Sequence, residues 1–103
     1  MDNHTLNYLA DRYPTLDLQS LRILALVAEW QGASMAEIAE ELGTTHQHVQ
    51  FHVSMLGRGK LGRERHGLNL LNVEYDVFDK RRRNLKLTQA GERVIKAIKP
   101  LIN

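Results

Sequence analysis

Two stretches of the chain hold side chains whose types and spacing could do chemistry. In the first, Gln47 and Gln50 stand three residues apart in a segment with helical spacing. In the second, residues 80–83 are four consecutive cations. A glutamine amide donates and accepts at once, as the major-groove edge of adenine requires, and an arginine guanidinium suits the negative potential of a narrow minor groove. Both stretches therefore predict contact with nucleic acid.

No arrangement of residues typical of an enzyme occurs elsewhere in the sequence. The chain has no cysteine, which excludes disulfides, thiolate metal sites and a cysteine nucleophile. It also has no glycine-rich phosphate loop after a strand and no His-Glu-x-x-His run. His48 and His52 have the i, i+4 spacing that can hold a metal ion, and His46 is close, but no carboxylate is arranged around them. We expect no enzyme activity, no metal and no cofactor, and a packed or hydrogen-bonded His52.

The composition is that of a single globular domain covering residues 1–103. Hydrophobic residues make up 43% and charged residues 25%, which argues against a disordered tail. No apolar run approaches the ~20 residues of a membrane span, and the N-terminus lacks the charged start and apolar stretch of a signal peptide. We expect a cytoplasmic protein without a membrane partner.

Charge is divided unevenly along the chain. Residues 1–56 hold two basic and seven acidic side chains, whereas residues 57–103 hold twelve basic and five acidic ones. The two halves therefore carry −5 and +7 in a chain whose net charge is +2. Such asymmetry indicates a surface that meets a polyanion, although a solvated basic face without a partner would show the same pattern.

The spacing of apolar residues and the capping residues predict helices in the first half of the chain. Residues 3–12 form the first helix, with Asn3 as its N-cap. Asp17 caps a second helix, which ends near Trp30 and has Gly32 where a C-cap belongs. Both helices present apolar faces that must pack against the rest of the domain.

Two shorter helices follow, joined by a turn that contains glycine. Ser34 and Glu37 form a capping box at the start of the first, and Gly43 ends it. Thr44 or Thr45 caps the second, which runs from His46 to about Leu56. Two short helices joined in this way are the helix-turn-helix pattern.

The second helix of this pair buries Val49 and Val53, so its opposite face points outward. Gln47 and Gln50 lie on or near that face and are candidates for reading bases, while hydroxyls and the first helical amides could hold phosphate. Phe51 could touch a thymine methyl group or pack against the hairpin. The residues of this segment predicted to contact DNA are Thr45, His46, Gln47, Gln50, Phe51, Ser54 and Arg58.

The last part of the chain predicts a β-hairpin followed by a helix. Residues 73–78 and residues 85–87 alternate as strands do, and a polar turn over residues 79–83 joins them. Thr88 caps a final helix that carries an apolar stripe. The order of these elements predicts a mainly α fold with a small β-hairpin wing (α+β), the winged helix-turn-helix.

The sequence from residue 17 to residue 101 resembles the MarR family of bacterial transcriptional regulators. Residues 34–43 look like the third helix of that family. The run Asp79-x-Arg81-x-x-x-Leu85-x-Leu87-Thr88-x-x-Gly91 is similar to its wing signature. The resemblance implies regulation of transcription through sequence-specific binding to double-stranded DNA. It also implies that Asp79 orients an Arg81 that enters the minor groove, with phosphates near Lys80, Arg82 and Arg83.

The chain departs from the family's pattern in two places. The path between the second short helix and the hairpin is longer, with extra residues around positions 66–72, so either the first strand is long or a loop is inserted. The terminal helices, residues 3–13 and 88–102, are shorter than those that interlock into a dimer and help form a ligand pocket in the family. The sequence therefore leaves a small-molecule effector undecided.

The apolar stripes on the two terminal helices nevertheless predict that these helices pack together and form the interface of a symmetric homodimer. The stripe on the last helix is too wide for one side of a small domain to cover. The residues assigned to this interface are Leu6, Leu9, Tyr13, Val94, Ile98, Leu101 and Ile102.

A different class of function shares the same fold. A winged helix can act as an interaction module that binds protein or RNA, for example in a replication, phage or plasmid complex. The basic hairpin favours nucleic acid but does not distinguish DNA from RNA. Duplex DNA binding with a sequence preference, measured against RNA at matched salt, separates the two interpretations.

Overall fold

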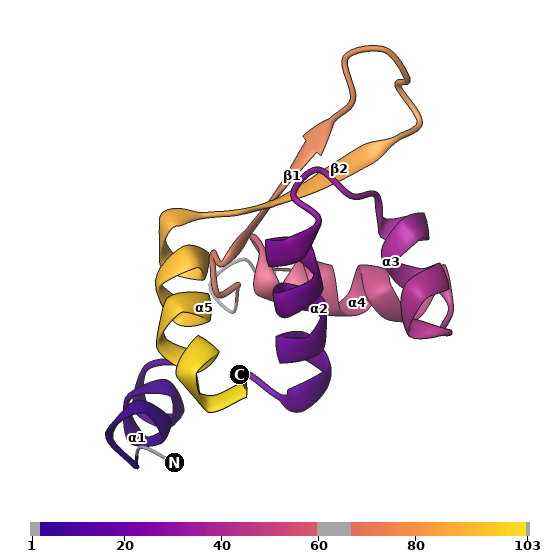
Figure 1. The fold of residues 1–103 in the computed structure, drawn as a ribbon. Coiled ribbons are helices and arrows are strands. Elements are labelled where there is room, and N and C mark those ends of the chain that lie inside the picture. Colours follow the sequence, from indigo (N-terminus) through magenta and orange to yellow (C-terminus); the bar gives the residue numbers. More distant parts are fainter. Residues whose placement is uncertain (1–2, 60–66, 103) are drawn as a thin grey trace.

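A computed structural model describes residues 3–59 and 67–102, with the side chains of residues 101 and 102 outside the described part. Within these ranges, five helices and an antiparallel hairpin follow one another (Figure 1). They are α1 Asn3–Arg12, α2 Leu18–Glu29, α3 Met35–Leu42, α4 His46–Leu56, β1 Leu71–Tyr75, β2 Arg83–Leu87 and α5 Gln89–Ile102. This order confirms the predicted winged helix-turn-helix. No helix in the described ranges is both long and apolar enough to cross a bilayer.

Side-chain caps define the beginnings of the helices. Asp17 accepts a hydrogen bond from the Ser20 amide at 2.8 Å before α2. Ser34 and Glu37 form the predicted capping box of α3, in which each side chain accepts from the other residue's amide at 3.1 Å. Gly43 ends α3 with a φ of 66°, the left-handed conformation that glycine adopts readily. These predictions are confirmed because each depends on residues that are neighbours in the chain.

Two other predicted caps are wrong. Asn3 is already helical in α1 rather than its N-cap. The C-cap of α2 is Trp30, whose amide donates to the Leu26 carbonyl at 2.9 Å. Gly32 instead has a φ of 90° in the following turn, where its amide donates to the Leu85 carbonyl at 2.8 Å. Gly32 therefore joins this turn to the hairpin and does not end the helix.

The hydrophobic core draws on all five helices, on both strands and on the chain between them. Helix α2 packs against both α4 and α5. Burying one aliphatic side chain contributes about 1.5–3 kcal/mol of transfer free energy. The largest fully buried side chains are Ile23, Leu24, Val27, Ile38, Val49, Val53, Leu56, Leu70, Leu85 and Val94. The predicted inner face of α4 is among them, so its opposite face is left for solvent or a partner.

The hairpin is joined to the helix-turn-helix by backbone hydrogen bonds. Within the hairpin, Val73 of β1 stands opposite Leu85 of β2. On the other side of β2, the Leu85 amide donates to the Ala33 carbonyl at 2.8 Å. The chain between α2 and α3 thus adds a short third partner to the ladder, and the hairpin projects beyond the helices from this anchored base (Figure 1).

The predicted boundaries of the first strand are wrong. The strand runs over Leu71–Tyr75 rather than 73–78, and residues 76–82 form the turn. The carboxylate of Asp76 accepts hydrogen bonds from the amides of Phe78 and Asp79 at 2.8 and 3.0 Å. These bonds fold the chain out of the ladder. The alternating pattern therefore continued past the real end of the strand.

The segment expected to hold extra residues, 66–72, is described from residue 67 onward, and His66 lies outside the described residues. The amides of Leu68 and Leu70 donate to the carbonyls of Met55 and Leu56 at 3.0 and 2.7 Å. Leu70 is fully buried. Because β1 has only five residues, the structure excludes the first of the two alternatives, a long first strand. The amide bonds of Leu68 and Leu70 hold residues 67–70 along the end of α4.

The two terminal helices, α1 and α5, pack together as predicted. Four residues assigned to a homodimer interface are buried inside the single chain, namely Leu9, Tyr13, Val94 and Ile98. Of the stripe on the last helix, Val94 and Ile98 are thus covered within one chain. Leu6 is 40% exposed, while the side chains of Leu101 and Ile102 lie outside the described residues. A homodimer stays a prediction.

Gly91 allows α5 to approach the chain that leads into β1. A Cβ atom at this position would lie 2.1 Å from the Leu70 carbonyl oxygen. We expect Gly91→Ala to lower the free energy of unfolding by about 1–3 kcal/mol, although alanine favours helix, because the backbones must separate. Urea denaturation measures this change. Gln89→Ala, exposed on the same helix, is the control and should change stability by less than about 0.5 kcal/mol. Equal stability of the two variants would contradict the close approach.

Candidate nucleic-acid interface

Helix α4 begins at a threonine cap. The Thr45 hydroxyl accepts a hydrogen bond from the His48 amide at 3.1 Å, which selects Thr45 over Thr44 as the cap. The first turn of α4 is therefore well ordered, and its other leading amides are available to an anion. The Thr45 hydroxyl also keeps its own proton to donate.

The predicted contact residues of α4 lie on the outside of the molecule. By contrast, Val49 and Val53 on the inner face of α4 are fully or almost fully buried. Ser54 is half-buried, and the Phe51 ring is 49% exposed and stands edge-on to the His52 ring at 5.3 Å. The exposed members of the set are Thr45, His46, Gln47, Gln50, Phe51 and Arg58.

His52 links α4 to α2. It is 7% exposed, and its Nδ1 lies 3.0 Å from the Ser20 hydroxyl, which confirms a packed, hydrogen-bonded histidine. Asp17 Oδ1 lies 3.9 Å from the same nitrogen. The Ser20 amide, with a smaller contribution from His52, holds the pKa of Asp17 below its usual value. Among the described residues, no three His, Asp or Glu side chains are grouped to bind a metal.

The four cations of the hairpin have different surroundings. Lys80 and Arg81 are exposed in the turn. Arg83 is exposed on β2, with its guanidinium 5.1 Å from the centre of the Tyr75 ring. Arg82 alone is half-buried. Three of the four consecutive cations therefore face solvent, and the fourth, Arg82, lies partly within the protein.

Arg82 connects the hairpin with the start of α3. Its guanidinium forms an ion pair with Glu37, donates to the Gly32 carbonyl at 3.2 Å, and donates from Nε to the Asn84 amide oxygen at 2.7 Å. Asp76 Oδ2 lies 3.7 Å from the same Nε. Because the Arg82 guanidinium is bonded to these groups of the protein, Arg82 positions the wing.

Two carboxylates around Arg82 are stabilised in their charged forms. The Ser34 amide, followed by Arg82, holds the pKa of Glu37 below its usual value. The Asn84 amide, followed by the Phe78 and Asp79 amides, lowers the pKa of Asp76. Both groups are therefore ionised at neutral pH and can attract the guanidinium.

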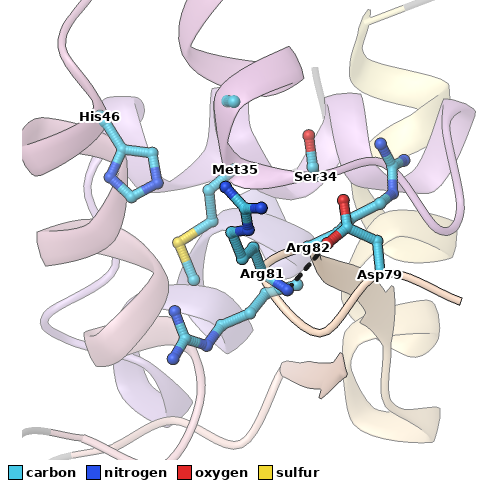
Figure 2. A pocket seen from close by; sticks show the side chains of 8 residues that line it. Ser34, Met35, His46, Asp79, Arg81 and Arg82 are labelled. Atoms are coloured by element: carbon cyan, nitrogen blue, oxygen red, sulfur yellow. Dashed lines mark hydrogen bonds between the residues drawn. The ribbon is translucent and has the colours of Figure 1, made fainter. Parts of the chain in front are cut away.

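Asp79 contacts the main chain of Arg81. Its carboxylate accepts a hydrogen bond from the Arg81 amide at 3.0 Å (dashed in Figure 2). Its carbonyl accepts from the Arg82 amide, also at 3.0 Å. The bracing role that the family resemblance implied for Asp79 is therefore possible through the backbone of the turn, which aims the Arg81 side chain.

The turn and α4 border a common cavity of about 240 Å³. Figure 2 shows His46 from α4 beside Met35, with Arg81 and Arg82 from the hairpin facing the same space. A second, larger hollow lies between the outer face of α4 and β1. Its lining includes Gln50, Ser54, Arg58, Tyr75 and Arg83. The fold therefore brings Gln50 of the first stretch and residues 81–83 of the second to neighbouring hollows.

Three functional residues of the wing were missed in the sequence analysis. Asp76 was interpreted as part of the first strand, Asn84 received no assignment, and Glu37 was interpreted only as half of a capping box. Asn84 donates to Asp76 at 3.0 Å across the base of the turn. The only local signal in the sequence was that Asp76 and Asn84 flank the run of cations. The contact between Glu37 and Arg82 has no local signal, because it joins distant parts of the chain.

No family model and no curated protein matches the sequence. Solved structures do match. FabT from Streptococcus pneumoniae in complex with DNA is 17% identical, with a TM-score of 0.76 over 95% of this chain and 62% of FabT. The S. aureus MepR–DNA complex is 20% identical, with a TM-score of 0.71 over 96% of this chain and 73% of MepR. A MarR-like transcriptional regulator from Thermotoga maritima is 28% identical, with a TM-score of 0.65 over 87% of this chain and 57% of that protein.

The architecture and the site together define a winged helix-turn-helix domain whose polar helix and cationic wing share one side. Its fold is that of MarR-like transcriptional regulators, as the resemblance in the sequence implied. The chain spans 62% of the length of FabT and 57% of the length of the Thermotoga maritima regulator.

The contacts of Arg82 predict a stability effect that its neighbour lacks. We expect Arg82→Ala to lower the free energy of unfolding by about 1–2 kcal/mol, a value reduced for its partial exposure. Arg82→Lys should not restore it, because an ammonium cannot reproduce the forked contacts. Arg81→Ala removes the same charge from an exposed position and should change stability by less than about 0.5 kcal/mol. The urea midpoints of the three variants measure this, and equal losses for Arg81→Ala and Arg82→Ala would reject the positioning role.

Proposed function

We propose that this domain is a sequence-specific regulator that binds double-stranded DNA, with α4 in the major groove and the hairpin in the adjacent minor groove. One observation carries the proposal. His46 at the start of α4 lines one hollow with Arg81 and Arg83 of the hairpin. Gln50 and Ser54 of α4 line a second hollow, which Arg83 also borders. The DNA complexes of the structurally similar FabT and MepR support it.

Each contact residue receives a role from its chemistry and its exposure. Gln47 and Gln50 read base edges, and Phe51 contacts a thymine methyl group. Thr45, His46, Ser54 and Arg58 hold phosphates beside α4. Arg81 enters the minor groove from a turn that Asp79 braces, and Lys80 and Arg83 contact the flanking phosphates. Arg82 positions the wing instead of binding phosphate itself.

The biological setting is proposed on the same basis. A regulator of this kind acts in the cytoplasm, uses no cofactor and catalyses no reaction. A palindromic DNA site would require a homodimer. Since four of the residues first assigned to such an interface are buried within one chain, the proposed dimer forms through other surface residues. Light scattering at micromolar concentration reports whether two copies associate.

The salt dependence of binding tests the proposal. Four outward cations, Arg58, Lys80, Arg81 and Arg83, would give a slope of about −3 to −4 in a plot of log affinity against log salt. Fluorescence anisotropy of a dye-labelled duplex measures it. Arg81→Ala should make the slope shallower by about one, whereas Lys96→Ala, the same charge loss on exposed α5, should not. A slope near zero, or tighter binding to RNA than to DNA at matched salt, would overturn the proposal.

The role of the glutamines is tested on a site selected from a random duplex pool. Gln47→Ala and Gln50→Ala should each weaken binding to that site by about 1–3 kcal/mol and leave binding to unselected DNA nearly unchanged. Gln89→Ala, an exposed glutamine on α5, is the matched control. Equal losses on selected and unselected DNA would show that the glutamines do not read bases.

A further inference from the structure

The tip of the hairpin exposes apolar side chains that the core does not use. Phe78 is 98% exposed and Val77 is 88% exposed, the highest values among the exposed large hydrophobic residues described. Tyr75, at the end of β1, is 68% exposed. Single exposed apolar residues are common, but an adjacent pair at the most protruding part of a fold is a candidate contact surface.

The chain that presents this pair is ordered by several hydrogen bonds. The Asp76 carboxylate accepts from the Phe78 amide at 2.8 Å, and the Asp76 amide donates to the Arg82 carbonyl at 3.0 Å. Asn84 and Arg82 hold the same carboxylate from the other side. Phe78 is therefore held outward by a closed turn that is anchored to α3 through Arg82.

Three cations of the hairpin, here called the collar, lie close to the apolar pair in the chain. Lys80 and Arg81 follow it in the turn, and Arg83 lies at the start of β2, all three exposed. The only exposed acid of the turn, Asp79, has its carboxylate on the Arg81 amide. An apolar tip with a cationic collar matches a partner that combines a polyanionic surface with a stacked aromatic interior.

We propose that Phe78, supported by Val77, is an apolar wedge that inserts between base pairs from the minor groove of duplex DNA and bends the duplex. The inference rests on the proposed function. Apolar side chains that enter the minor groove commonly unstack a base step and kink the helix toward the major groove. The cations of the collar hold the phosphates on either side, and Arg81 occupies the groove next to the wedge. The bent DNA thereby follows the protein from the hairpin to α4.

A tryptophan at position 78 reports insertion directly. The chain has one tryptophan, Trp30, so Phe78→Trp in a Trp30→Phe background has a single emitting side chain at the tip. On addition of a short A·T-rich duplex, stacking between bases should quench its emission several-fold and protect it from acrylamide. Leu18→Trp in the same background is the control, because Leu18 is 79% exposed at the start of α2 and outside both hollows.

The outcomes of this experiment separate the wedge from the proposed function. Anisotropy of the dye-labelled duplex records binding in parallel. Binding with an unchanged, acrylamide-accessible emission at position 78 overturns the wedge and leaves DNA binding in place. Absence of binding overturns both. Quenching or a blue shift with phosphatidylserine vesicles but not with DNA would mean that the tip enters membranes, and this also overturns the wedge. If Trp30→Phe does not fold, the difference spectrum between Phe78→Trp and the unsubstituted chain gives the same answer.

Removal of the ring tests the bend. Phe78→Ser should weaken binding to the duplex about tenfold or more, since stacking of one base on an aromatic ring carries an effect of that size. It should also reduce the energy transfer between dyes at the two ends of the duplex, because the bend is lost. Gln89→Ser on α5 serves as the control. Equal affinity and equal energy transfer for Phe78→Ser and the unsubstituted chain would exclude the wedge.

Discussion

The position of the hairpin relative to the helices depends on the contacts of the Arg82 guanidinium. A two-stranded hairpin is marginally stable alone, so its direction must be set by what it is tied to. Arg82 ties it to Glu37 at the start of α3 and to the Gly32 carbonyl in the preceding turn. The backbone bonds between Leu85 and Ala33 act beside it. Together they fix the wing relative to the helix-turn-helix, and hence relative to α4.

The hairpin turn combines rigidity with an exposed surface suited to a polyanion. The Asp76 carboxylate accepts hydrogen bonds from the amides of Phe78 and Asp79. These bonds hold the shape of the loop, which has no hydrophobic core of its own. Lys80 and Arg81 can then face outward, because the fold needs only Arg82 among the turn's cations. The same turn leaves Phe78 in solvent. A fixed turn loses less conformational entropy on binding than a mobile one, which favours tight contact.

The terminal helices illustrate how a small domain uses its apolar surface. Val94 and Ile98 on α5 belong to a core that includes Leu9 and Tyr13, so one chain covers part of a stripe that resembled an interface. The close approach at Gly91 lets α5 lie against the chain before β1. Here, any assembly must use what the core leaves exposed.

The sequence by itself determined several features that depend on near neighbours. The caps at Asp17, Ser34 and Gly43, and the outward face of α4, follow from spacings of three or four residues, and all were predicted correctly. The tertiary structure decided which of four adjacent cations turns inward, because only folding brings Glu37 to Arg82. It also decided which residues of the α5 stripe the core covers. Those outcomes depend on contacts between distant segments, such as the hydrogen bond between Arg82 and Gly32, which are 50 residues apart. A local sequence pattern cannot predict such contacts.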